Sequence, residues 1–246
     1  MMSNIGDHFI ELPIVDSTNI YAMQEVHARM AKHGTVYFAH TQTHGKGQRG
    51  KTWISREGEN IALSVVFEPV LSGPSAPFTF NIAIALACYD FCKSYLGDEI
   101  RIKWPNDLYW RDRKAGGILI ENLFRGNSWE FSVAGIGMNI NQVDFPPDIP
   151  NPVSFRQITG KSFQLIPLAR ELCTHLQARW VELNTDSSSL LKAYNKVLYQ
   201  RGNTVKLRKK NRIFEARIET VSENGELEVF TSMPESFQHG EVEWLQ

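Results

Sequence analysis

Residues 41–60, TQTHGKGQRGKTWISREGEN, place glycines, cations and a tryptophan between two runs that read as β-strands. The letters G-x-G-x-x-G from Gly45 fit a dinucleotide-binding fingerprint and a kinase loop, and G-x4-G-K-T from the same glycine fits a P-loop. The dinucleotide loop and the P-loop both need a helix directly after them, because its N-terminal amides hold the phosphates. Residues 61–67, IALSVVF, follow instead, and this short β-branched run predicts a strand.

The kinase interpretation also fails, because the chain has no His-Arg-Asp and no Asp-Phe-Gly motif. What remains is a strand-to-strand loop that carries three cations, Lys46, Arg49 and Lys51. Such a loop is suited to handling phosphates, and a surface loop that binds nothing is the alternative that the loop alone leaves open.

Composition is that of an ordinary globular protein able to bury a full core, with 246 residues of which 42% are hydrophobic. Its 26 basic and 27 acidic side chains leave a net charge of −1, so there is no basic field for a nucleic-acid backbone. We find no secretory signal and no apolar membrane span, and three cysteines give neither a disulfide framework nor a zinc site. We therefore expect a cytoplasmic protein that binds neither DNA nor membranes.

The first helix is predicted over residues 19–33, because the capping residues at 16–19 precede apolar positions at helical spacing. The side chains at its start either cap the helix or hold a ligand, and the sequence leaves both readings open. Residues 35–40 and 61–67 read as strands on either side of the glycine-rich loop, and residues 78–96 as a buried helix.

The middle of the chain predicts an antiparallel meander with strands at 99–103, 107–110, 114–121 and 129–140. Glycines inside two of these strands, at 116, 117, 135 and 137, indicate a close approach by a ligand or by another part of the chain. Lys103 and Lys114 are expected on neighbouring strands on either side of Asn106 and Asp107, so cations and a metal-binding carboxylate could meet on one sheet face. Solvated edge charges are the alternative.

Beyond the meander, helices are predicted at 166–183 and 190–199. Short strands then follow at 204–207, 213–221, 227–230 and 242–245, joined by tight turns. We expect two domains, a larger one over residues 1–200 and a small barrel over residues 201–246.

Five signatures in order make the chain resemble the biotin protein ligases. They are Ser17-Thr-Asn19, Gly45-Lys-Gly-Gln-Arg-Gly-Lys-Thr-Trp53, Lys103-Trp-Pro-Asn-Asp-Leu108, Lys114-Ala-Gly-Gly-Ile-Leu119 with Glu121, and Gly135-Ile-Gly-Met-Asn-Ile140. The resemblance implies an α+β fold: a mixed, largely antiparallel sheet backed by helices, related to class II synthetases, with a small C-terminal SH3-like barrel.

In that family, biotin and MgATP form biotinyl-5'-AMP and pyrophosphate, and a lysine of a carboxylase's biotin carrier domain then takes the biotin. The resemblance thus implies ATP and Mg²⁺ as cofactors, with no tightly bound metal or prosthetic group. A homodimer formed through sheet edges is a further expectation. Some members carry an N-terminal DNA-binding domain, and because only 15 residues precede Asp16 we expect this protein to lack it.

Site residues follow from the resemblance by position. Those implied for biotin are Ser17, Thr18, Asn19, Gln42, Lys46, Gly47, Gln48, Trp53, Lys114, Gly116 and Gly117. Those implied for ATP are Arg49, Lys51, Trp53, Lys103, Asn106, Asp107 and Asn139, with Asp107 as the magnesium ligand. The catalytic groups would be Lys114, Lys46 and Arg49.

One departure from the family is visible, because its loop is commonly Gly-Arg-Gly-Arg-Arg-Gly and this chain has Lys46 and Gln48 in place of the first two arginines. Lys46 keeps a charge but loses the bidentate fork, and Gln48 has no charge.

The alternatives are a lipoate ligase on the same fold, a P-loop nucleotide hydrolase and a binding module built on the barrel. The biotin-type loop argues against a lipoate ligase. The missing helix after Thr52 argues against a P-loop hydrolase, and a binding module would leave the loop cations unexplained.

Overall fold

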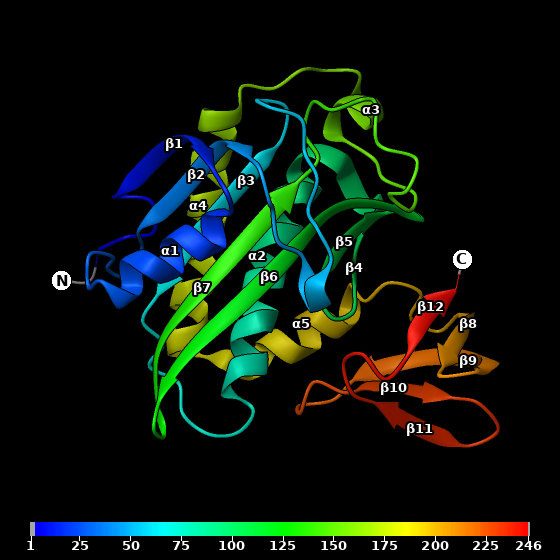
Figure 1. Ribbon diagram of the computed structural model, residues 1–246. Coiled ribbons are helices and arrows are strands. Elements are labelled where there is room, and N and C mark those ends of the chain that lie inside the picture. Colours follow the sequence, from blue (N-terminus) through cyan, green and yellow to red (C-terminus); the bar gives the residue numbers. More distant parts are fainter. Residues whose placement is uncertain (1–2, 246) are drawn as a thin grey trace.

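The computed structural model describes residues 3–245, which form a seven-stranded and a five-stranded sheet (Figure 1). The larger sheet consists of β1 (Phe9–Val15), β2 (Val36–Gln42), β3 (Ile61–Phe67), β4 (Ile100–Lys103), β5 (Asp107–Trp110), β6 (Arg113–Arg125) and β7 (Ser128–Met138). Its strand order is β1-β2-β3-β7-β6-β5-β4, in which only β1 and β2 pair in parallel. The predicted mixed, largely antiparallel sheet is confirmed, and so is the strand-to-strand setting of the glycine-rich loop.

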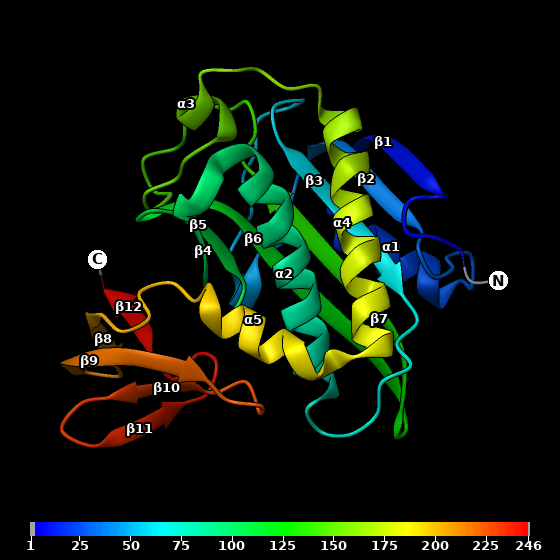
Figure 2. The ribbon, with the colours of Figure 1, turned by 180° about the vertical axis from the view of Figure 1, so that it is seen from behind.

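Helices lie on both faces of the larger sheet. Figure 2 shows α2 (Ala76–Leu96), α4 (Leu165–Thr185) and α5 (Leu190–Lys196) on one face, and Figure 1 shows α1 (Thr18–His27) on the other. The short α3 is Phe155–Thr159, and single 3-10 turns cover Gln48–Gly50, Gly97–Glu99 and Ser187–Ser189. Among the described residues no helix is long and apolar enough to cross a membrane.

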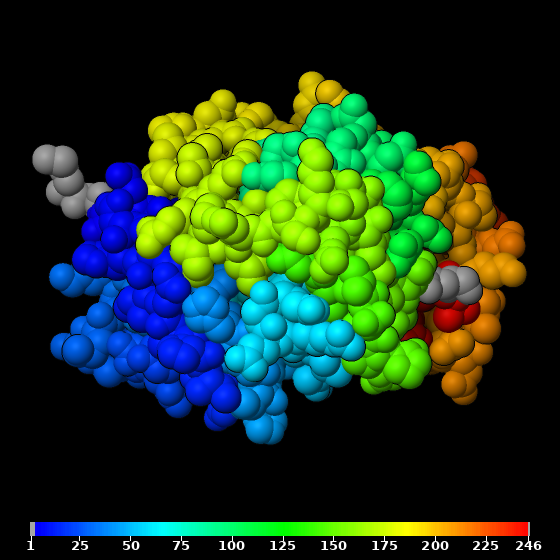
Figure 3. All heavy atoms as spheres, turned by 90° about the horizontal axis from the view of Figure 1, so that it is seen from above, coloured from blue at the N-terminus to red at the C-terminus, as the bar shows by residue number. Residues whose placement is uncertain are grey.

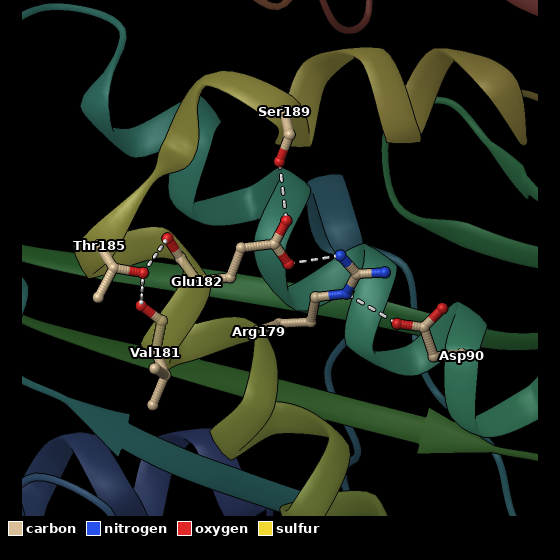
Figure 4. Close-up of polar contacts among 6 residues, drawn as sticks. All are labelled: Asp90, Arg179, Val181, Glu182, Thr185 and Ser189. Atoms are coloured by element: carbon tan, nitrogen blue, oxygen red, sulfur yellow. Dashed lines mark hydrogen bonds and ion pairs between the residues drawn. The ribbon is translucent and has the colours of Figure 1, made fainter.

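The main core lies between the sheet and α2, which explains why α2 is apolar all round. Thirteen of its 21 residues are buried, and α4 adds an apolar stripe at four-residue spacing, with Leu168, Leu172, Leu176 and Trp180 all buried. An ionic cluster joins the two helices on their outer side (Figure 4). There Arg179 donates to Asp90 at 2.7 Å and to Glu182 at 2.6 Å.

The C-terminal sheet consists of β8 (Thr204–Lys209), β9 (Arg212–Val221), β10 (Leu227–Phe230), β11 (Pro234–Phe237) and β12 (Glu243–Leu245). Its order is β11-β10-β9-β8-β12, and every pair is antiparallel. Views from the front and from above place this sheet at the opposite end of the molecule from the blue N-terminal segment (Figures 1 and 3). The small C-terminal β unit of the expected fold is thereby confirmed, while the boundary near residue 200 stays a prediction.

Three expectations about individual elements need correction. The first helix ends at His27 and not at His33, because Arg29 adopts a φ of +59° that no α-helix continues through, and Met30 is left 71% exposed. The helix predicted to Tyr199 stops at Lys196. Lys103 and Lys114 are not on neighbouring strands, because β5 lies between β4 and β6.

Candidate functional site

A cleft of about 1450 Å³ runs from the start of α1, under the glycine-rich loop, to the C-terminal sheet. It brings together nearly all of the residues expected at the site. Those that line it are Ser17, Thr18, Asn19, Gln42, Lys46, Gly47, Gln48, Arg49, Lys51, Trp53, Lys103, Asn106, Asp107, Lys114, Gly117 and Asn139. Gly116 does not line it. A Cβ at Gly116 would lie 2.8 Å from the Gly137 carbonyl oxygen, so this glycine serves the contact between β6 and β7.

A polar group closes the end of the cleft at the start of α1. Thr18 donates to Gln42 Oε1 through both its backbone N–H, at 2.8 Å, and its hydroxyl, at 3.1 Å. Since both contacts require an acceptor, the Gln42 amide is oriented with its oxygen toward α1 and its NH₂ group left for other partners. Ser17, at the N-cap, is only 2% exposed and makes no side-chain capping bond. The sequence left capping and ligand binding open, and capping by the Ser17 side chain is not what the structure shows.

Asn19 differs from these neighbours because its amide is saturated by the protein. Its Nδ2 donates to the Leu119 carbonyl at 3.2 Å and to Glu121 Oε2 at 2.9 Å, and its Oδ1 lies 2.6 Å from the Ser64 hydroxyl. It lies over Gly135, where an added Cβ would come 2.1 Å from Asn19 Oδ1. Both amide hydrogens of Asn19 are therefore used within the protein, where they fix the floor of the cleft.

Gly137 makes room for Trp53 in the same way. A Cβ at Gly137 would lie 2.5 Å from the nearest atom of the Trp53 indole, so the ring rests directly on β7. The indole Nε1 is buried and has no hydrogen-bond partner among residues 3–245. The close approach predicted at Gly135 and Gly137 is confirmed, and the loop tryptophan covers the floor of the cleft.

Lys114 and Asp107 form an ion pair on the sheet face that forms the floor of the cleft. Lys114 Nζ lies 2.7 Å from Asp107 Oδ1, and the two side chains are 28% and 25% exposed. Gly117, on β6 with Lys114, leaves space for the pair. A Cβ at Gly117 would lie 3.4 Å from the Lys114 ammonium and 3.2 Å from the Asp107 carboxylate. The pair fixes the Lys114 ammonium and the Asp107 carboxylate on the cleft floor.

Lys103 lies among three aromatic rings. Its ammonium is 4.5 Å from the centre of Tyr109, 5.3 Å from Trp244 and 5.9 Å from Tyr199. Burial lowers the pKa of Lys103 to about 8, and the nearby Lys114 and Lys51 act in the same direction while Asp107 opposes them. Lys103 is thus a cation whose charge is sensitive to what binds beside it.

The two asparagines assigned to ATP are largely engaged with the backbone. The Asn106 amide donates to the Ile118 carbonyl, which fixes the turn between β4 and β5. Asn139 Nδ2 donates to the carbonyls of Lys114 and Val153, both at 3.2 Å. Asn139 therefore holds the backbone of Lys114 and has no amide hydrogen left for a nucleotide.

The loop cations occupy different places along the cleft. Lys46 Nζ lies 3.7 Å from Glu121 Oε1 at the α1 end. Arg49, at a φ of +54°, reaches the C-terminal sheet, where its Nη1 donates to the Gly240 carbonyl at 3.1 Å. The adjacent His239 has a lowered pKa, first because it is half-buried and second because Arg49 is close.

Some lining residues were not found from the sequence. They are chiefly Arg208 and Trp244 in the C-terminal sheet, Lys210 and His239 in its turns, and Phe145, Ile149 and Pro150 of the proline-rich segment. Nothing in their local pattern marks them, because only the folding of the whole chain brings these separate segments to the cleft.

A magnesium site made by protein alone is not present within residues 3–245, which contain no group of three or more His, Cys, Asp or Glu side chains placed to hold a metal. The donor set nevertheless fits a metal carried in with phosphates, since Mg²⁺ usually takes one or two carboxylates, phosphate oxygens and water. Asp107 supplies such a carboxylate in the cleft, with one oxygen engaged by Lys114.

Comparison with known families agrees with the motifs. Residues 11–139, more than half of the chain, match the biotin/lipoate A/B protein ligase family. The chain belongs to this family. The match ends at Asn139, so it covers α1, the glycine-rich loop and the β4–β7 meander, which together carry most of the cleft.

Among the family's relatives, the bifunctional ligase/repressor BirA of Escherichia coli (strain K12) is 36% identical over 135 residues, which cover 55% of this chain and 41% of that protein. The biotin--[acetyl-CoA-carboxylase] ligase of Paracoccus denitrificans is 32% identical over 152 residues, covering 59% and 61%. The matched part of the chain thus spans about two fifths to three fifths of the length of these relatives.

A solved structure shows the same fold over the full length. The biotin protein ligase from Aquifex aeolicus in complex with biotin and ATP superposes with a TM-score of 0.80 at 21% identity, covering 98% of this chain and 99% of that one. The fold, including the C-terminal sheet, is therefore that of this ligase.

Proposed function

We propose that this protein is a biotin ligase, which activates biotin with ATP to biotinyl-5'-AMP and transfers it to a lysine of a carboxylase's biotin carrier domain. The observation that carries the proposal is the cleft itself. It joins an oriented polar end at Thr18 and Gln42 to a floor with Lys114 and Lys103, under a loop with three more cations. Membership of the biotin/lipoate ligase family and the ligase names of the relatives support it.

The first step brings two anions together, because a carboxylate attacks an α-phosphate. Such a site must supply fixed positive charge, alignment and exclusion of water, and needs no nucleophilic side chain. We assign the polar end of the cleft to biotin, with the Gln42 NH₂ group as a donor. We assign Lys114 to the point where the biotin carboxylate meets the phosphate, and Trp53 to the cover.

ATP then lies toward the C-terminal sheet, past Lys114 and Asp107. Lys103, Arg49 and Lys51 line that part and match a polyphosphate in charge. Asp107 would hold magnesium together with the ATP phosphates, where the metal would neutralise charge on the leaving pyrophosphate. When substrate takes up Lys114, the paired oxygen of Asp107 becomes available.

In the second step, the ε-amino group of the acceptor lysine attacks the biotinyl carbonyl and AMP leaves. We place the reaction in the cytoplasm, to which three free, buried cysteines are suited. We further propose that any homodimer forms through β1. The other edge, β4, is partly covered because Ile102 exchanges backbone hydrogen bonds with Val197 and Tyr199. Size-exclusion chromatography with light scattering measures whether a homodimer forms.

The decisive experiment is biotin-dependent exchange of labelled pyrophosphate into ATP. We expect exchange with biotin, AMP and pyrophosphate as the products, and transfer to a carrier domain when one is added. Exchange with lipoate in place of biotin would show that the protein is a lipoate ligase. Release of ADP and phosphate would overturn the proposal.

A further inference from the structure

Glu121 on β6 stands at the edge of the cleft without lining it, and its two carboxylate oxygens have different partners. Oε2 accepts a hydrogen bond from Asn19 Nδ2 at 2.9 Å. Oε1 lies 3.7 Å from Lys46 Nζ. A single carboxylate thus connects the start of α1 to the glycine-rich loop.

The Asn19 side of this connection is rigid. Asn19 is 3% exposed, and all of its amide hydrogens are used within the protein. Its position over Gly135 leaves no space for it to move toward β7. Because Asn19 holds Oε2 of Glu121 in place, the position of Oε1 is also fixed.

The Lys46 side is more open, because the side chains of Lys46 and Glu121 are 46% and 34% exposed. Lys46 belongs to a small hairpin closed by two backbone bonds, from Gly47 N to the Lys51 carbonyl at 2.7 Å and from Trp53 N to the Gly45 carbonyl at 2.8 Å. Because these bonds make the loop one unit, holding Lys46 also holds the segment that carries Arg49 and Trp53.

We propose that Glu121 is a positioning residue, which holds the glycine-rich loop over the biotin end of the cleft through Lys46. The inference rests on the proposed function, since the loop is taken to cover biotinyl-adenylate. Glu121 itself touches no reacting atom. A partly exposed ion pair of this kind changes an equilibrium about two- to fivefold, so Glu121 adjusts how long the loop stays closed and does not create the site.

Glu121 could instead weaken ligand retention. A carboxylate beside Lys46 could compete with the anionic ligand for the same ammonium. In that case, removal of the Glu121 charge would tighten ligand binding. Positioning by Glu121 requires that its removal loosen the loop.

Glu121→Gln is the variant of choice, because its amide oxygen can still accept from Asn19 while the charge is lost. Biotinyl-adenylate formed on the enzyme is chased with excess unlabelled biotin and ATP, and its dissociation rate is measured at low and high salt. We expect dissociation about two- to fivefold faster at low salt, and less difference at high salt because salt screens the wild-type pair. Glu121→Gln should add nothing further in a Lys46→Gln background.

Glu130→Gln is the matched control. Glu130 pairs with Arg125 at 3.5 Å on the same β6–β7 hairpin, and this pair does not reach the glycine-rich loop, so its loss should leave adenylate dissociation unchanged. Unchanged or slower dissociation in Glu121→Gln, or effects of Glu121→Gln and Lys46→Gln that simply add, would overturn the role of Glu121.

A second readout needs no substrate. Trypsin cleavage after Arg49 and Lys51 in the ligand-free protein, followed by mass spectrometry, should be about two- to fivefold faster in Glu121→Gln than in wild type. If wild type made no adenylate but this difference appeared, the proposed function would fail while loop positioning by Glu121 stood. If wild type made adenylate but trypsin cleaved both proteins at the same rate, the proposed function would stand and loop positioning by Glu121 would fail.

Discussion

At the scale of single residues, Lys114 is the cation whose surroundings are best fixed. It is paired with Asp107 at 2.7 Å, and Asn139 holds its backbone, whereas Lys51 lies exposed in the loop. Removing one preorganised group that faces developing charge typically costs on the order of a hundredfold or more in rate. We expect Lys114→Gln to fold normally and lose pyrophosphate exchange to that extent, with a smaller loss for Lys51→Gln.

Arginine at position 114 should not restore the activity, because a planar fork cannot replace a compact charge in a closed site. Circular dichroism melting curves serve as the folding control for all three variants. If Lys114→Gln catalysed pyrophosphate exchange at a rate within about threefold of wild type, the contacts of Lys114 would serve only the structure of β6. Lys103 would then be the residue to test.

Lys103 gives a prediction about pH. Burial lowers its pKa to about 8, so the free protein loses this positive charge as the pH rises through that value. Polyphosphate favours the protonated amine, and ATP binding should therefore take up protons and weaken from about pH 7 to about pH 9. Titration calorimetry in buffers of different ionisation enthalpy measures this uptake.

Lys103→Arg is the control for that experiment, since its guanidinium stays charged across the whole range. Its ATP affinity should show a smaller pH dependence. An identical pH slope in wild type and Lys103→Arg would assign the titration to another group.

At the scale of elements, β7 and the loop depend on each other through Gly137 and Trp53. A Cβ at Gly137 would meet the indole at 2.5 Å, so Gly137→Ala must lift Trp53 from the strand. We expect faster proteolysis of residues 46–53 and weaker adenylate retention in this variant, with little change in melting temperature because Trp53 lies outside the main core. In a Trp53→Ala background the same substitution should have no further effect on the loop, and an equal effect in both would contradict the contact.

The sequence predicted those elements whose signals are local. The run Ile61–Phe67 was identified to the residue, and its place after the loop excluded a P-loop. The glycines of β7 also indicated a close approach, although the sequence could not show that Asn19 and Trp53 make it. These side chains come from segments far from β7 in the chain, and only the folded sheet brings them together.

The elements that the sequence does not predict depend on interactions between distant parts of the chain. β1 pairs in parallel with β2, contains Pro13, and alternates poorly because it is an edge strand. The spacing of Met30 predicts a first helix that continues to His33, yet the Met30 side chain faces solvent. The motifs imply ligand roles for Asn19 and Asn139, and what the sequence cannot show is that the protein already uses their amide hydrogens.

At the scale of the whole molecule, the cleft belongs to both sheets, so its shape depends on how the C-terminal sheet is held. Trp104 Nε1 donates to the Gly225 carbonyl at 3.0 Å. Asn195 at the end of α5 donates to the Val221 carbonyl at 2.9 Å and accepts from the Val221 N–H at 2.7 Å. These contacts fix the wall that carries His239 and Trp244.

Asn195→Ala tests this arrangement, because it leaves two buried backbone groups of Val221 without partners. That loss costs about 2–4 kcal/mol, which corresponds to a melting temperature lower by roughly 4–16 °C for a chain of this size. The Michaelis constant for ATP should rise, since the loosened wall lies at the nucleotide end, while the constant for biotin changes little. Asn184→Ala is the matched control, because Asn184 bonds only within its own helix, to the Trp180 carbonyl. Equal changes in the constants for both substrates would show that Asn195 supports the fold as a whole and not the nucleotide end of the cleft.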